Sequence, residues 1–350
     1  MVIVEDPPAT TPHGDAITAI VPVEATAGDW TMFHGTPSRE GVSGAPHIAR
    51  PRLRWLQQIG VQGWLNSPLI AGQQVVVPSS GNTHNASDPR DGVFALELAT
   101  GRIAWHAHFS GDANGAAVAG DKVIATSDDG HIYGLDDQTG RIVWKQSGQG
   151  KVYTTPLILG DLGVVGDAQG YLRAFRWADG TKRWEARMNG AIRGGAASDG
   201  QAIYAVSQGG EVAAFGLDGT AIWRVGAQRP AYSGGTLEAI EGYAAPIVTG
   251  GLVVVPFARD TYYPTPAFLA LDARTGKVRW RASSDNASLT WGNVRSTPVL
   301  VHNLLVFAEA YSSDVAGIDV TTGAARYRAA VGRCMIPQYG APAAAGTVLI

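Results

Sequence analysis

The stretch GHIYGLDDQTGRIVW, residues 130–144, has the sequence pattern of a β-hairpin. His131, Tyr133 and Leu135 alternate with smaller residues, DQTG supplies a turn, and Ile142 and Trp144 resume the alternation. Alternation with a period of two predicts strands and excludes a helical repeat. Five stretches elsewhere in the chain share the pattern: VFALELATGRIAW (93–105), YLRAFRWADGTKRW (171–184), EVAAFGLDGTAIW (211–223), FLALDARTGKVRW (268–280) and VAGIDVTTGAARY (315–327).

The hairpins recur with a period of about 40 residues, which is typical of solenoids and propellers. One complete unit can be followed in KVYTTPLILGDLGVVGDAQGYLRAF, residues 151–175. An inner strand is followed by a tight Gly-Asp turn, a second strand, a loop and then the hairpin, which makes four antiparallel strands. Four-stranded units arranged around an axis form a β-propeller, because that arrangement leaves only short sheet edges exposed. The sequence therefore predicts an all-β propeller.

Composition agrees with one large β-domain. Of the 350 residues, 45% are apolar and 16% charged, and 45 are glycine, so strand formers and turn residues dominate. The net charge of −3 and the absence of a long basic run argue against nucleic-acid binding. No apolar run reaches the roughly 20 residues of a membrane-spanning helix. The N-terminal sequence does not have the pattern of a signal peptide, and the single cysteine, Cys334, excludes an intrachain disulfide.

Counting strands predicts how the ring closes. Seven inner strands begin near Asn66, Asn114, Thr154, Gly194, Ala244, Ser296 and Gly340, and seven fourth strands end near Trp55, Trp105, Trp144, Trp184, Trp223, Trp280 and Tyr327. We therefore expect residues 28–350 to form one propeller domain of seven blades, with PRLRW (51–55) closing the ring against GAPAAAGTVLI (340–350). Eight blades in a longer parent protein is the alternative.

The closing blade lacks its third strand. The last unit stops after its second strand, so either AITAIVPVE (16–24), within an N-terminal extension of residues 1–27, supplies the third strand, or more of the blade follows. The hairpin residues themselves are expected to be structural. The tryptophans should fill the space between neighbouring sheets, the glycines should permit turns, and Asp136, Asp272 and Asp319 should bind turn amides.

These motifs also resemble a known family. The hairpins with their TG turn and terminal tryptophan, the inner strands of [ST]xP type, and GDWTMFHGTPSREGVSG (28–44) are similar to PQQ-binding-like propeller-repeat proteins. That group includes quinoprotein alcohol dehydrogenases and the propeller lipoprotein of outer-membrane assembly. The resemblance covers residues 28–350 and implies the propeller fold. It implies function weakly, because the repeats encode architecture.

Long loops are expected on only one face of the propeller. The turns between first and second strands, and between third and fourth strands, lie on one face and are short. The loops between second and third strands, and the connections between blades, lie on the other. Insertions occur there at residues 79–92, 226–242, 258–267, 281–293 and 328–340. Binding sites usually form where loops are elaborated on a rigid scaffold, so we expect a ligand site on this second face.

Residues just before the inner strands should surround the mouth of the central channel. The ligand-binding candidates among them are aromatic, cationic or amide side chains: Trp64, Asn66, Tyr153, Arg193, Tyr243, Trp291, Arg295, Gln338 and Tyr339. Asn114, Lys151, Glu241 and Asn293 belong to the same ring. Aromatic rings, amides and guanidinium groups together suit a polar or anionic ligand.

The sequence contains no complete catalytic set. The resemblance implies that a quinoprotein dehydrogenase would use a vicinal disulfide, a Ca²⁺ site and an aspartate base. The single cysteine and the lack of a calcium-binding loop therefore disfavour PQQ chemistry, and no cofactor is expected. His84, Glu241 and Asp260 are weak acid–base candidates. His106 and His108 alternate along an outer strand, a spacing that can bind a metal but is more common on a polar surface, so no metal site is expected.

Two functions of different class follow. The first is a non-catalytic propeller that binds a protein, a peptide or another ligand on the loop face. The alternative is an enzyme, or a binder of a glycan or specialised metabolite, with its site at the channel mouth under the loops of blades four to one. Whether the protein is an enzyme stays open. The resemblance points to an extracytoplasmic location.

Overall fold

The structure is a computed structural model. It describes residues 29–44, 53–61, 67–226, 228–230, 237–239, 244–256, 266–283, 296–308, 314–330, 344–345 and 348–349. Every regular element in these ranges is a β-strand. The same ranges contain no helix with the length and hydrophobicity needed to cross a bilayer. The all-β class predicted from the repeat is therefore confirmed.

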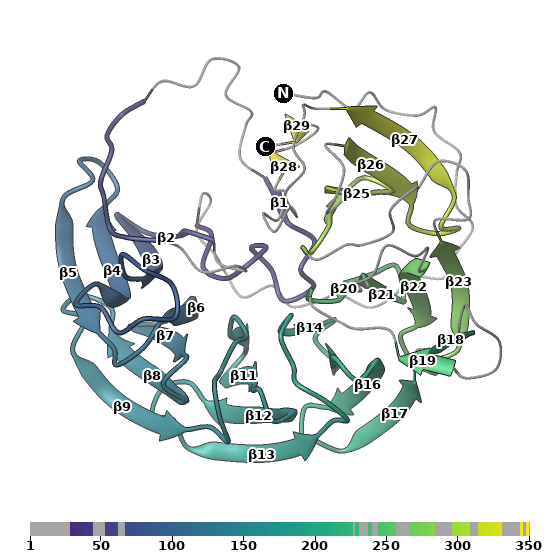
Figure 1. Ribbon diagram of the computed structural model, residues 1–350, viewed down its shortest axis with the longest axis horizontal. Helices are drawn as coiled ribbons and strands as arrows, with labels where there is room; N and C mark the ends of the chain where they lie inside the picture. The colour runs from purple at the N-terminus through teal and green to yellow at the C-terminus, as the bar shows by residue number, and fades with distance from the viewer. Residues whose placement is uncertain are drawn as a thin grey trace.

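Six four-stranded antiparallel sheets stand around a central axis, each in sequence order from the axis to the rim (Figure 1). Blade one contains β2 (Leu69–Ala71), β3 (Gln74–Ser80), β4 (Asp91–Glu97) and β5 (Ile103–His108). Blade two contains β6 (Ala113–Ala119), β7 (Lys122–Ser127), β8 (His131–Asp136) and β9 (Ile142–Ser147). Blade three contains β10 (Leu157–Leu159), β11 (Leu162–Gly166), β12 (Tyr171–Arg176) and β13 (Lys182–Arg187).

The second half of the ring repeats this order. Blade four contains β14 (Ala196–Ser198), β15 (Ala202–Val206), β16 (Glu211–Gly216) and β17 (Ala221–Gly226). Blade five contains β20 (Ile247–Thr249), β21 (Leu252–Pro256), β22 (Pro266–Asp272) and β23 (Val278–Ser283). Blade six contains β24 (Val299–Val301), β25 (Leu304–Ala308), β26 (Asp314–Asp319) and β27 (Ala325–Ala330). Between blades four and five, β18 (Gln228–Pro230) and β19 (Leu237–Ala239) form a separate two-stranded sheet.

A further small sheet joins the two ends of the chain. It contains β1 (Val42–Ser43), β28 (Ala344–Ala345) and β29 (Val348–Leu349), and β1 pairs with β28 in parallel. An N-terminal strand thus meets the C-terminal sheet, but it is β1 and not the expected PRLRW. Residues 53–61 form no strand. Six complete blades and this partial sheet are consistent with seven blades.

The hydrophobic core lies between neighbouring blades. One cluster joins Tyr204 and Val206 of blade four to Val253 and Leu271 of blade five, and similar clusters fill the other spaces. The predicted hairpin is β8 with β9, in which Gly134 lies opposite Trp144. Blades two to five each pack both faces against a neighbouring blade, so the repeated strands stabilise the ring.

The hairpin tryptophans link each blade to the next, as predicted. Each indole N–H donates to a backbone carbonyl in the turn between the third and fourth strands of the following blade: Trp105 to Asp137, Trp144 to Trp177, Trp184 to Leu217, Trp223 to Ala273 and Trp280 to Val320, all at 2.8–3.0 Å. Each ring covers the glycine of that turn. A Cβ on Gly140, for example, would approach Trp105 to 2.5 Å, and its φ of 71° also favours glycine.

Replacing Trp144 by phenylalanine is expected to lower the free energy of unfolding by about 1 to 2 kcal/mol. Phenylalanine keeps an aromatic ring over Gly180 but leaves the Trp177 carbonyl without its indole donor. Urea unfolding of the wild type and the variant measures the difference. Because Trp184 makes the same contact with the next blade, Trp184→Phe should lower the free energy of unfolding by a similar amount. If both variants are as stable as the wild type, the indole N–H does not stabilise the fold.

The aspartates of the hairpins hold the turns, as predicted. Asp136 accepts a hydrogen bond from the backbone N–H of Thr139 at 2.9 Å, and Asp272 accepts one from Thr275 at 2.8 Å. Hydrogen bonds from Thr275 and Arg279 lower the pKa of Asp272 to about 2. These carboxylates are bound to their own turns and are structural.

Residues 29–44, here called the belt, cross the centre of the ring along the inner strands (Figure 1). Its backbone forms hydrogen bonds with one inner strand after another: Trp30 with Ile70, Thr31 with Val118, Pro37 with Ser198, Ser38 with Val248 and Glu40 with Leu300. These partners lie near the ends of the inner strands, next to the turns to the second strands. The belt therefore occupies the channel at the face of short turns, here called the turn face.

The belt ends at the closing sheet and is fixed by a buried arginine. Its last residues form β1, which pairs with β28. The Arg39 side chain is fully buried and donates hydrogen bonds to the carbonyls of Phe33, Ala196 and Pro156. Because Pro156 precedes β10, this side chain supplies the contact with blade three.

Candidate functional site

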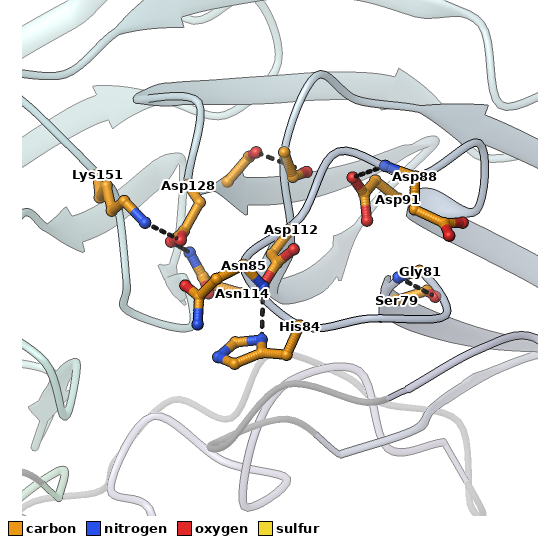
Figure 2. A network of polar contacts seen from close by, with 12 residues as sticks. Ser79, Gly81, His84, Asn85, Asp88, Asp91, Asp112, Asn114, Asp128 and Lys151 are labelled. Atoms are coloured by element: carbon orange, nitrogen blue, oxygen red, sulfur yellow. Dashed lines mark hydrogen bonds and ion pairs between the residues drawn. The ribbon is translucent and has the colours of Figure 1, made fainter.

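The opposite face, here called the loop face, carries the loops between second and third strands and the connections between blades. The blade-one insertion, between β3 and β4, is the insertion that the structure describes in full. Its tip is held by Asp88, which accepts hydrogen bonds from the Asn82 amide at 2.9 and 3.2 Å and from the Arg90 backbone at 2.8 Å. Figure 2 shows His84 and Asn85 of this loop beside Asp112, which precedes β6 of blade two.

Asp112 fastens the insertion to blade two. Its buried carboxylate lies 2.6 Å from Nδ1 of His84 and accepts a hydrogen bond from the Asn85 backbone at 2.9 Å. Asn85 has a φ of 60°, a left-handed conformation that asparagine tolerates. His84 was predicted as a weak acid–base candidate with Glu241 or Asp260, but the structure pairs it with Asp112. We read this pair as a contact that positions the loop.

Asp91 lies at the base of the insertion. Its side chain is buried and accepts a hydrogen bond from the Asp88 backbone at 2.9 Å. Burial raises the pKa of Asp91, and the nearby negative charges of Asp112 and Asp88 raise it further. The rings of His106 and His108 each place a nitrogen 3.2 Å from the Asp91 carbonyl. Nowhere in the described ranges do three or more His, Cys, Asp or Glu side chains form a group that could hold a metal ion.

The polar network continues into blade three (Figure 2). Asp128 accepts a hydrogen bond from the Asn114 amide at 2.7 Å and pairs with Lys151. The bond to Asp128 raises the pKa of Lys151. Asn114 also donates to the Val152 carbonyl at 3.0 Å. Asn114 and Lys151, both predicted to surround the channel mouth, are thus brought together by a carboxylate that the prediction did not include.

Tyr153 and Arg193 form the next contact around the mouth. The Arg193 guanidinium lies over the Tyr153 ring, 4.2 Å from its centre, and its Nε donates to Gln208 Oε1 at 2.9 Å. Both side chains are half-buried. Among the described residues, no carboxylate forms an ion pair with Arg193. Two predicted ligand-binding residues therefore touch each other and hold a guanidinium in a fixed orientation.

A cavity of about 490 Å³ that is wide open to solvent lies farther out, between the ends of β13 and β17. Its lining includes Arg187, Met188, Asn189, Glu211 and Arg224. Arg224 pairs with the Glu211 carboxylate at 2.6 Å, while Arg187 lies over Tyr171 and donates to its hydroxyl at 2.9 Å. Asn189 donates to the Gly209 carbonyl at 3.2 Å, in the same short loop that carries Gln208. The cavity and the Arg193 contact thus share the loop face of blades three and four.

The other predicted site residues lie outside the described part of the chain. These are Trp64, Asn66, Glu241, Tyr243, Asp260, Trp291, Arg295, Gln338 and Tyr339, together with Asn293. Of the residues that the structure adds, Asp112 precedes β6 without any motif. Asp128 and Gln208 share a visible signal, because SDDG (127–130) and SQGG (207–210) occupy the same place in their repeats as DAQG (167–170).

The fold and these features define a class. Six four-stranded blades, linked by tryptophans over turn glycines, are those of a PQQ-like β-propeller repeat protein. A family model described as outer membrane protein assembly factor BamB matches residues 90–194 and 168–334, more than half of the chain. The chain belongs to this family.

Individual relatives carry the same name. The assembly factor BamB of Xanthomonas campestris is 31% identical over 135 residues, which is 38% of this chain and 33% of the relative. That of Moranella endobia is 26% identical over 220 residues, or 60% of this chain and 52% of the relative. The chain thus spans between a third and about half of these relatives.

A solved structure supports the fold. The crystal structure of BamB from Moraxella catarrhalis superposes with a TM-score of 0.57 at 21% identity, over 78% of this chain and 73% of that one.

Proposed function

We propose that the protein is a non-catalytic propeller that binds a protein partner on its loop face, across blades two to four. Membership of the BamB family supports a binding role, and the names of the relatives suggest outer membrane protein assembly as the process. The belt supports the choice of face, because it fills the channel at the turn face and leaves the loop face as the elaborated one.

The observation that carries the proposal is the contact of Arg193 with Tyr153 and Gln208. A guanidinium that is already oriented loses little entropy on binding, and arginine and tyrosine beside a cavity are frequent energetic centres of protein interfaces. Arg187 at the nearby cavity adds positive charge, whereas the charge of Arg224 is balanced by its ion pair with Glu211. We infer that the partner presents a carboxylate, from an acidic side chain or a chain end, to Arg193.

Replacing Arg193 by alanine is expected to weaken partner binding by about tenfold or more without changing the stability of the propeller. Partners are captured from a cell-envelope extract on the immobilised protein and identified, and the affinity of each purified partner is then measured by calorimetry. Tyr153→Ala should weaken binding as well, because the guanidinium then loses its stacking surface.

Arg176→Ala provides the matched control. Arg176 is an exposed arginine of blade three that pairs with Asp179 in the turn between β12 and β13, on the turn face. The Arg176→Ala variant should bind the partner with the same affinity as the wild type. Equal affinity of the wild type and both loop-face variants would contradict the proposal, as would a small molecule that binds at Arg193 and is chemically converted.

A further inference from the structure

The Arg39 side chain carries a positive charge into the interior of the ring. It is fully buried and donates hydrogen bonds to three backbone carbonyls, those of Phe33, Ala196 and Pro156. Among the described residues, no carboxylate forms an ion pair with Arg39. The carbonyls supply hydrogen bonds but no net negative charge, and a buried charge is costly until an opposite charge compensates it. The surroundings of this guanidinium therefore favour an anion.

The guanidinium joins the inner strands of blades three and four where they begin, on the side of the loop face. Its Nη2 donates to Pro156, just before β10, at 3.2 Å, and its Nε donates to Ala196, the first residue of β14, at 3.0 Å. The residues that precede these two are Thr155 and Gly195. They are neighbours in space, because a Cβ on Gly195 would lie 3.4 Å from the Thr155 hydroxyl oxygen. The hydroxyl and the guanidinium therefore lie at the same junction of two inner strands.

The Thr155 hydroxyl is buried without a hydrogen-bond partner among the described residues. The residue is only 4% exposed, and buried hydroxyls of native proteins are almost always paired. The preceding Thr154 shows the usual case, since its hydroxyl donates to the Gly166 carbonyl at 3.1 Å. A Cβ on Gly195 would meet the two Thr155 oxygens at 3.4 Å and nothing nearer in the described chain, so glycine leaves room beside this hydroxyl.

We propose that a small monovalent anion, such as chloride, binds between the Arg39 guanidinium and the Thr155 hydroxyl. The hydroxyl donates its proton to the anion, and the guanidinium supplies the opposite charge. A guanidinium has five N–H groups, of which the three carbonyls use three, so it can also donate to the anion. One bound ion then accounts for two features together, the buried charge with neutral partners and the buried hydroxyl with none.

The anion site is distinct from the contact proposed for the protein partner. Arg193 lies two residues before Gly195 on the same connection, but its guanidinium is stacked on Tyr153. Arg193→Ala therefore removes the partner contact and keeps both groups of the anion site. The two proposals can fail separately, because one is measured by partner affinity and the other by the response to a salt.

Thermal unfolding in two salts tests whether an anion binds. The midpoint of the wild type is expected to be about 2 to 4 °C higher in sodium chloride than in sodium gluconate of the same ionic strength. A ligand that binds only the folded chain stabilises it, and gluconate is too large for a place that a Cβ would fill. Thr155→Val keeps the shape of the side chain but not the donor, and should lose most of this difference, whereas Thr155→Ser should retain it.

Ser80→Ala is the matched control. The Ser80 hydroxyl is also buried without a partner in the described chain, but it lies in blade one, so the chloride effect should persist in this variant. A chloride effect that is just as large in Thr155→Val would place the ion elsewhere and overturn the proposal. So would a Thr155→Val variant that is at least as stable as the wild type in both salts, because the hydroxyl would then be simply unpaired.

Bromide locates the ion directly. Crystals of the wild type grown in sodium bromide should show an anomalous scattering peak between the Arg39 guanidinium and the Thr155 hydroxyl, and crystals of Thr155→Val should show none there. Peaks confined to the protein surface, or a water molecule at this position, would contradict the proposal.

Discussion

Replacing Arg39 by methionine is expected to lower the free energy of unfolding by about 3 kcal/mol or more. The guanidinium joins the belt to blades three and four through three buried carbonyls, at 3.0 Å to Ala196 and 3.2 Å to Pro156 together with the bond to Phe33. Methionine fills a similar volume but leaves all three oxygens without a donor. Burial lowers the pKa of Arg39 to about 9, so the side chain is still charged at neutral pH.

Chemical unfolding at pH 7 measures this effect, with Arg183→Met as the control. Arg183 is exposed and pairs with Asp161 at 2.9 Å, so its loss should change stability by no more than about 0.5 kcal/mol. Arg39→Lys should lose nearly as much as Arg39→Met, because an ammonium group cannot match three carbonyls arranged around a planar guanidinium. An Arg39→Met variant within about 1 kcal/mol of the wild type would show that the belt is not fixed by this side chain.

Replacing His34 by asparagine is expected to remove a large part of the acid sensitivity of the fold. Burial lowers the pKa of His34 from 6.5 to about 3, and the positive charge of Arg39 lowers it too. The neutral ring donates from Nδ1 to the Arg39 carbonyl at 3.0 Å, while its buried Nε2 has no hydrogen-bond partner in the described structure. Asparagine tolerates the φ of 57° and can donate from a similar position.

Proton binding by His34 sets the direction in which stability changes with pH. Below pH 6.5 the unfolded chain takes up a proton at His34, and the folded chain does not until about pH 3. Stability is therefore lost as the pH falls through this window, by about 1.4 kcal/mol per pH unit and about 5 kcal/mol in all. The free energy of unfolding is measured at pH 7, 6, 5 and 4 for the wild type and for His34→Asn. Between pH 7 and pH 4 it should fall more for the wild type than for the variant.

His302→Asn is the matched control, because His302 also has a left-handed backbone, with a φ of 52°, but lies exposed in the turn between β24 and β25. Its stability should run parallel to that of the wild type across the same pH range. Parallel curves for His34→Asn as well would mean that His34 takes up its proton at the same pH in the folded and the unfolded chain, which would contradict the lowered pKa.

The repeated elements could be predicted from the sequence because one short pattern determines each of them. The alternation around DQTG determines the hairpin, and the glycine and tryptophan of the same pattern determine the contact between blades, so the sequence alone predicts both. The geometry of the candidate site, in contrast, depends on contacts between different repeats. Tyr153 and Arg193 were each predicted to lie at the channel mouth, but their stacking depends on two neighbouring connections whose distance no local pattern encodes.

The belt could not be predicted for a different reason. Its residues were recognised only as part of a family resemblance, since they lack the alternation of a strand and bind one inner strand at a time. Similarly, PRLRW was predicted to be a strand because Trp55 ends the repeat pattern. The tryptophan occupies the expected place, but a strand also needs a neighbour, and neighbours are a property of the assembled ring.

The order of the belt contacts has a consequence for how the protein folds during synthesis. The belt leaves the ribosome before the six blades, and its successive residues bind blades one, two, four, five and six in the order in which those blades are made. Each new blade therefore meets an attachment point beside the one that its predecessor has just occupied. The final contacts join residues far apart in the chain, and closing such long loops costs conformational entropy. Because the blades bind the belt one after another, this entropy cost is divided into small steps.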